Sequence, residues 1–94
     1  MIVRIDIHND EHNSYSYAVT AEHQTVYDGS GFSSIINALA AAVEGFGAEV
    51  RAAEIAFRGI VSGTYPLHTI ATRPNEIAQH AVNTADAVYA AEDE

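Results

Sequence analysis

Hydrophobic and polar residues alternate along the first third of the chain in the manner of half-buried β-strands. In residues 3–8 an apolar residue occupies every second position, beginning at Val3, and polar residues fill the positions between. A similar alternation covers residues 14–19, and a shorter one covers residues 24–28. A period of two sends successive side chains to opposite faces of a strand. Because the turns expected at 9–13 and 21–23 are short, we predict an antiparallel three-stranded meander.

The apolar period changes from two to about 3.6 beyond residue 33. Residues 29–31 read Gly-Ser-Gly and are expected to end the third strand, after which Ser33 or Ser34 can cap a helix. Gly45 and Gly47 are expected to end that helix. Its predicted apolar stripe consists of Ile35, Ile36, Leu39, Val43 and Phe46.

The second half of the chain predicts a strand, a loop and a longer helix. Residues 50–60 read as a fourth strand, with Ala53, Ile55 and Phe57 facing the core. Glycine and proline interrupt residues 61–72, so we expect a loop there, with a short strand near 67–70. A helix is predicted from 74 to 91, and the acidic tail at 92–94 is expected to be solvated and frayed. The apolar stripe of this helix is predicted to be Ile77, Ala81, Thr84 or Ala85, and Val88.

These elements predict one α+β domain that covers residues 1–94. The order β-β-β-α-β-(β)-α makes the first helix a crossover, which places the fourth strand parallel to the first. Both helices then cover one face of the sheet and form a two-layer sandwich with it. A chain of 94 residues is too short to build a second core.

Net charge is the property of the composition that says most about possible partners. Thirteen acids stand against four bases, all of them arginines, and the net charge is −9. Nucleic acids and anionic membranes bind through lysine and arginine, so we expect this chain to contact neither directly. A basic protein surface should attract it. The alternative is that the acidity serves only solubility, or reflects a salty host.

Cysteine content and the absence of long apolar stretches bear on the cellular compartment. The chain has no cysteine, which fits a reducing compartment. It has no apolar stretch of membrane-spanning length, and Arg4 and Asp6 place charges where a signal peptide would be apolar. We therefore expect a cytoplasmic protein, and a homodimer is compatible with the sequence.

Candidate reactive groups are few, and each has a structural alternative. His8 and His12 flank two carboxylates and could ligate a divalent cation, but the segment reads as a solvated turn, so we predict no metal and no other cofactor. Asp28-Gly-Ser-Gly precedes a helix as a phosphate loop would, but it lacks the following lysine. No serine stands in a nucleophile elbow, so no catalytic residue is predicted. A small enzyme whose site forms in an oligomer, through His8, His12 or His68, is the alternative.

Exposed acids and tyrosines are the better candidates for function. Core packing is the simplest role of the tyrosines on the second strand. If part of that face is uncovered, tyrosines ringed by carboxylates would form a protein-binding patch. The residues predicted to bind a partner are Asp10, Glu11, Glu22, Asp28, Glu54, Tyr15 and Tyr27.

The order of elements over residues 1–60 resembles the core of the ribonuclease H-like fold. Enzymes of that fold bind two metal ions through carboxylates on the first strand, the first helix and the end of the fourth strand. Asp6 matches the first position, but the helix places Glu44 at its far end, and Arg58 stands where the last acid is needed. We therefore expect no nuclease activity.

Two classes of small inhibitory protein are also similar to this chain. HicB-type antitoxins carry a degenerate version of the same fold, although Asp28-Gly-Ser-Gly replaces their Pro-Gly-Cys-like turn and no basic DNA-binding segment follows. Phage anti-CRISPR inhibitors resemble it in size, acidity and lack of catalytic residues. Our leading hypothesis is a non-enzymatic inhibitor that engages a basic surface of a nucleic-acid enzyme by charge mimicry. A HicB-like antitoxin subunit is the alternative binding protein.

Overall fold

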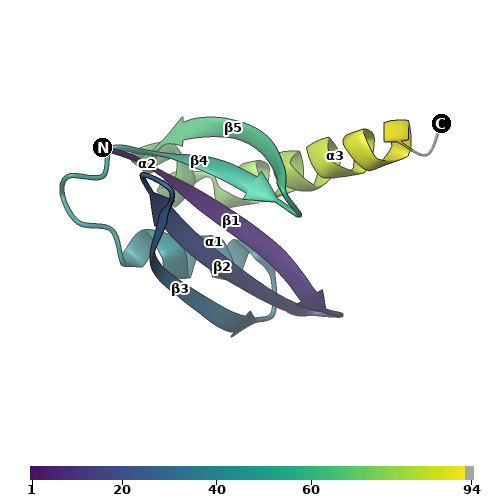
Figure 1. Ribbon diagram of the computed structural model, residues 1–94, viewed down its shortest axis with the longest axis horizontal. Coiled ribbons are helices and arrows are strands. Elements are labelled where there is room, and N and C mark those ends of the chain that lie inside the picture. Colours follow the sequence, from purple (N-terminus) through teal and green to yellow (C-terminus); the bar gives the residue numbers. More distant parts are fainter. Residues whose placement is uncertain (93–94) are drawn as a thin grey trace.

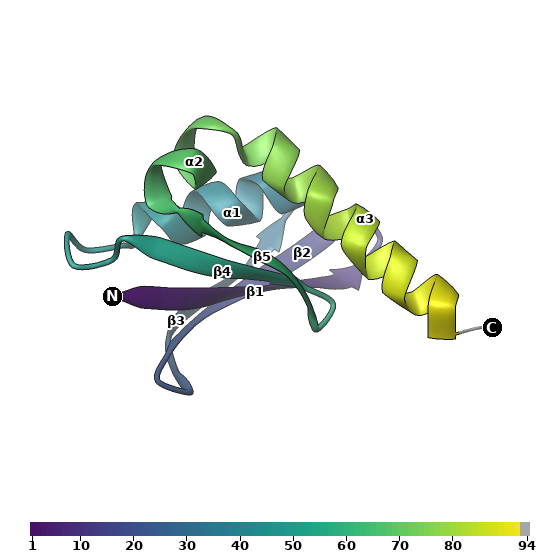
Figure 2. The ribbon, with the colours of Figure 1, turned by 90° about the horizontal axis from the view of Figure 1, so that it is seen from above.

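The computed structural model, which describes residues 1–92, is a five-stranded mixed sheet with three helices on one face (Figures 1 and 2). The predicted α+β class and layer arrangement are confirmed, as is the parallel pairing of the first and fourth strands. The sheet order is β3-β2-β1-β4-β5. Asp93 and Glu94, part of the tail expected to be frayed, lie outside the described residues. The strands are β1 (Ile2–Glu11), β2 (Ser14–Ala21), β3 (Gln24–Phe32), β4 (Ala52–Phe57) and β5 (Ile60–Pro66); the helices are α1 (Ile35–Glu44), α2 (Leu67–Thr72) and α3 (Pro74–Glu92).

Strand β1 lies at the centre of the sheet, and its odd-numbered residues build the core. Ile5 pairs with Val19 of antiparallel β2 and with Ile55 of parallel β4. All three side chains are at most 1% exposed. This row of apolar side chains beneath the helices accounts for much of the stability, because burial of each contributes roughly 1.5–3 kcal/mol.

The helices pack on the sheet through stripes that differ from the predicted ones at a few positions. Ser34 caps α1 as expected, since its hydroxyl accepts a hydrogen bond of 3.1 Å from the Asn37 N–H. Ile36, however, is exposed, and α1 instead buries small alanine side chains on the face that meets the sheet. None of the helices within residues 1–92 has the length and apolar content needed to cross a membrane. The buried residues are Ile35, Ala38, Leu39 and Ala42 in α1, and Ile77, Ala78, Ala81 and Ala85, not Thr84, in α3.

The first and third strands are longer than predicted. β1 continues to Glu11, so the expected turn at 9–13 shrinks to two residues, and β3 continues through Gly29 to Phe32. Register shifts within both pairings absorb the irregular residues, and Gly31 takes a φ of 83° that favours glycine. The Gly-Ser-Gly segment therefore belongs to β3, and it does not form the loop that a phosphate-binding site before the helix would need.

The segment from 50 to 72 differs most from the sequence prediction. β4 covers only 52–57, and a turn at Arg58 and Gly59, with φ values of 53° and 83°, leads into β5. The predicted loop at 61–66 is this fifth strand, and the short strand expected at 67–70 is instead helix α2. A two-residue turn with both φ values positive matches the twist of a hairpin. Arginine is unusual in such a turn, so the sequence gives little indication that a turn occurs at Arg58.

Candidate functional site

One face of the sheet is left uncovered, since α1, α2 and α3 all lie on the other side (Figure 2). Side chains alternate across a strand, so the even-numbered residues of β1, including Arg4, Asp6 and His8, point away from the helices. Residues that pair across strands lie on the same face of the sheet, so Glu54, the partner of Arg4, lies on this face as well. Asp28 also lies on it, because it pairs with Ala18, which in turn pairs with Asp6. We call this uncovered surface the open face.

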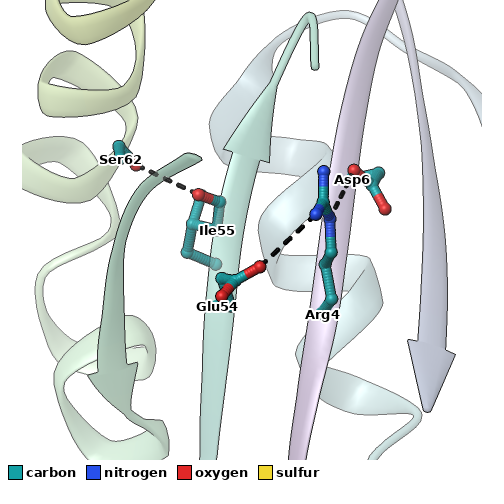
Figure 3. A network of polar contacts seen from close by, with 5 residues as sticks. All are labelled: Arg4, Asp6, Glu54, Ile55 and Ser62. Carbon is teal, nitrogen blue, oxygen red and sulfur yellow. Dashed lines mark hydrogen bonds and ion pairs between the residues drawn. The ribbon is translucent and has the colours of Figure 1, made fainter. Parts of the chain in front are cut away.

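Arg4 stands at the middle of the open face between two carboxylates (Figure 3). Its Nε donates to Asp6 Oδ1 at 2.9 Å, and its Nη1 donates to Glu54 Oε1 at 3.5 Å. The side chains of Arg4 and Glu54 are 39% and 37% exposed, so these ion pairs contribute little to stability, about 0–1 kcal/mol each. Their larger effect is on the charge of the open face, because the single positive charge of Arg4 is outweighed by the two negative charges of Asp6 and Glu54.

A first hollow lies beside the second half of β1, where His8 adjoins β2 and β3. Ser16 Oγ donates to Asp10 Oδ1 at 3.2 Å, which holds the Asp10 carboxylate over the open face. His8 pairs with Ser16 across the strands, and Asp28 approaches from β3. The hollow measures about 320 Å³, and its lining residues are His8, Ser16, Tyr17, Ala18, Asp28, Gly29 and Ser30.

A second hollow lies at the opposite end of the face, where β1 begins. It measures about 270 Å³ and brings Glu22 and His23 of the β2–β3 turn beside Arg4 and Glu54. Glu22 and His23 have φ values of 54° and 67°, the left-handed pair that a two-residue hairpin turn requires. The turn therefore presents one carboxylate and one imidazole to the open face. Among the described residues, five carboxylates belong to this face: Asp6, Asp10, Glu22, Asp28 and Glu54.

The structure brings together four of the predicted partner-binding residues and separates the others. Asp10, Glu22, Asp28 and Glu54 share the open face, whereas Glu11 is exposed at the end of β1. Sequence reasoning missed Asp6, although its place in the alternation with Val3, Ile5 and Ile7 was a sufficient signal. The two predicted tyrosines, Tyr15 and Tyr27, are half-buried against the core beneath the helices.

Tyr27 contributes to the fold through both its hydroxyl and its ring. Its hydroxyl donates to the Ala42 carbonyl at 2.6 Å, and its ring meets Tyr17 edge-on with centroids 6.1 Å apart. Burial, and to a lesser extent repulsion from Tyr17, raise the pKa of the Tyr27 phenol to about 12. The hydroxyl thus stays protonated at ordinary pH and keeps donating its hydrogen bond.

The histidines named in the alternative hypotheses belong to different parts of the fold. His8 faces outward from β1 and His12 lies in the following turn, while His68 belongs to α2 in the helix layer. No group of three or more histidine or acidic side chains within residues 1–92 is placed to hold a metal ion. Asp6, the match to the first nuclease carboxylate, is instead bound to Arg4.

The open face is accordingly the main gathering of chemistry-bearing side chains in the described part of the chain. It combines carboxylates, hydroxyls and two imidazoles, a set that includes many acceptors of hydrogen bonds from cationic groups. Comparison of the chain with models of protein families, with curated proteins and with solved structures finds no match to any of them.

Proposed function

We propose that this protein is a non-enzymatic binding protein whose open face engages a basic surface of a partner protein. One observation carries the proposal. Within residues 1–92 the open face holds five of eleven acids but only one of four arginines, and that arginine is already paired with two of the acids. A surface of this kind attracts lysine- and arginine-rich patches and steers their approach.

A nucleic-acid enzyme is the partner whose chemistry fits best. Such enzymes present lysine and arginine along the groove that holds phosphates, and carboxylates on one face of a sheet can pair with the same cations. The protein would then act as an inhibitor by charge mimicry, in the manner of a phage anti-CRISPR. The lack of cysteine is consistent with action in the cytoplasm, where such enzymes work.

A HicB-like antitoxin subunit is the second candidate, and the sheet topology favours it. The order β3-β2-β1-β4, with β1 parallel to β4, is that of a ribonuclease H-like core. An antitoxin of this kind would also bind a partner without catalysis. A toxin gene beside the gene for this chain, and co-purification of the two products, would favour this candidate over the first.

Removal of equal charge from two faces tests the proposal. One triple variant, Asp10→Asn, Asp28→Asn and Glu54→Gln, removes three charges from the open face. Its matched control, Glu44→Gln, Glu76→Gln and Asp86→Asn, removes three exposed charges from the helix layer. Binding of each variant to an immobilised oligoarginine peptide is measured from ~10 mM to ~1 M salt, over which the Debye length falls from ~30 Å to ~3 Å.

We expect the open-face variant to lose about tenfold or more in affinity, and its association rate to depend less on salt than that of the wild type. The helix-layer variant should remain within about threefold of the wild type. Equal losses from both variants would mean that the acidity acts only as total charge. In that case the open face is no binding site, and the proposal fails.

A further inference from the structure

We propose that His8 and His23 make binding at the open face sensitive to pH, so that a basic partner is held near neutral pH and released in mild acid. This inference rests on the proposed function and adds a regulatory property to it. Each of the two hollows on the open face contains one histidine, together with at least one carboxylate. The other histidines lie outside both hollows: His12 in the β1–β2 turn, His68 on α2 and His80 on α3.

His8 is surrounded by the acids that a cationic partner would seek. Asp6 and Asp10 neighbour it on β1, Asp10 being turned onto the same face by its bond from Ser16, and Asp28 shares its hollow from β3. On the β4 side the next charged residue is Arg58, whose guanidinium lies over the ring of Tyr89 in α3, 4.8 Å from its centroid. An incoming cation that pairs with these carboxylates therefore approaches the imidazole of His8.

His23 occupies the corresponding position in the second hollow. Glu22 precedes it in the turn, and Arg4 of β1 and Glu54 of β4 line the same hollow. Arg4 already places one positive charge there, although Asp6 and Glu54 offset it. Protonation of His23 would add a second positive charge beside Glu22 and would leave this hollow without an excess of acid.

Histidine is the side chain whose ordinary titration lies between pH 5 and 8. Over pH 7.0 to 5.5 carboxylates stay negative and guanidinium groups stay positive, so neither a carboxylate nor an arginine-only partner accounts for a change in binding. Protonation of both histidines takes the open face from five negative and one positive charge to five negative and three positive. Proton binding and partner binding then oppose each other, and affinity falls with pH.

The test uses the full chain and an oligoarginine peptide, whose own charge is constant over this pH range. Affinity is measured at pH 7.0 and 5.5 for the wild type, for His8→Gln with His23→Gln, and for the control His68→Gln with His80→Gln. All variants keep His12, so its contribution is common to them, and thermal melts at both pH values check folding. We expect the wild type and control to lose about fivefold or more in affinity at pH 5.5, and the His8/His23 variant to lose less than about twofold.

The possible failures are distinguishable. If the His8/His23 variant retains the full pH dependence, or if the wild type shows none, the inference is wrong while the proposed function stands. If the peptide does not bind the wild type, or binds the open-face charge variant equally well, the proposed function is wrong and the inference falls with it. Tighter binding by the His8/His23 variant than by the wild type at pH 5.5, with equal binding at pH 7.0, would support both.

Discussion

The hydroxyl of Tyr27 in β3 donates a 2.6 Å hydrogen bond to the carbonyl of Ala42 in α1. This carbonyl lies in the last turn of the helix, where it also accepts a hydrogen bond of 3.3 Å from the Gly45 N–H that ends the helix. The contact ties an edge strand of the sheet to the helix that covers it. It also explains why a tyrosine next to the exposed Asp28 belongs to the scaffold and not to the open face.

Replacement of this tyrosine should weaken the fold and change its response to alkali. Tyr27→Phe removes a partly buried hydrogen bond, so we expect a loss of about 1 kcal/mol near neutral pH, or a melting temperature lower by about 4–8 °C. Folding raises the pKa of the phenol to about 12, so its contribution is present below pH 10 and is lost as the pH rises towards 12. Urea melts between pH 8 and 12 should therefore show a smaller alkaline loss for Tyr27→Phe than for wild type. Tyr15→Phe is the control, and an identical pH profile for wild type and Tyr27→Phe would contradict this account.

Gly45 is required where α1 ends because Tyr27 lies against it. A Cβ at Gly45 would be 2.9 Å from the Tyr27 ring, while its φ of −83° is one that alanine adopts freely. Backbone entropy alone would make Gly45→Ala stabilising by about 0.4–1 kcal/mol, whereas the contact predicts destabilisation by about 1–3 kcal/mol. Gly47→Ala is the matched control, since its Cβ would meet only the flexible Glu49 carboxylate. Chemical denaturation gives the sign, and a more stable Gly45→Ala protein would show that Tyr27 is not held as described.

The elements with regular periodicity could be predicted from the sequence, and those held by tertiary contacts could not. Alternation around Ile5 and Val19 identified the central strands and the buried face. The extension of β3 through its glycines depends instead on pairing with β2, where a Cβ at Gly29 would be 2.8 Å from the Tyr17 ring. The fifth strand was expected near 67–70 but lies at Ile60–Pro66, because its hairpin turn begins with Arg58 in a left-handed conformation, which local propensity does not favour.

The candidate site was predictable in its chemistry and only partly in its membership. Charge alone pointed to acids, and four of the five proposed acids lie on the open face. Which acids share a face depends on strand register, and a slip of one residue exchanges the two faces. Tyr15 was grouped with them because its strand was expected to be partly uncovered, whereas α1 lies over that side of β2 and β3.

The assignment of the two faces can be tested with one substitution made at adjacent positions of β2. Val19 is 1% exposed and Thr20, which pairs with Arg4, lies on the open face. Val19→Asp buries an unpaired charge and should cost several kcal/mol, a large part of the ~5–15 kcal/mol that stabilises a domain of this kind. Thr20→Asp should change stability by less than about 1 kcal/mol. Circular dichroism melts of both proteins decide the matter, and similar melting temperatures would mean that the register is wrong.

Substitution of Arg4 should change stability and binding affinity in opposite directions. Arg4→Met keeps an unbranched apolar stem but removes the ion pairs with Asp6 and Glu54, which are half-exposed, so the loss of stability should not exceed about 1 kcal/mol. The same change removes the open face's arginine and frees two carboxylates for a cationic partner. Affinity for an oligoarginine peptide should therefore rise by about threefold to tenfold although the protein is slightly less stable. Arg73→Met, which removes an equal charge from the helix layer and only an exposed pair with Glu76, should leave the affinity nearly unchanged. Equal gains in affinity from both variants would mean that net charge alone drives binding, whereas a loss of affinity in Arg4→Met would mean that the ion-pair network itself shapes the binding surface.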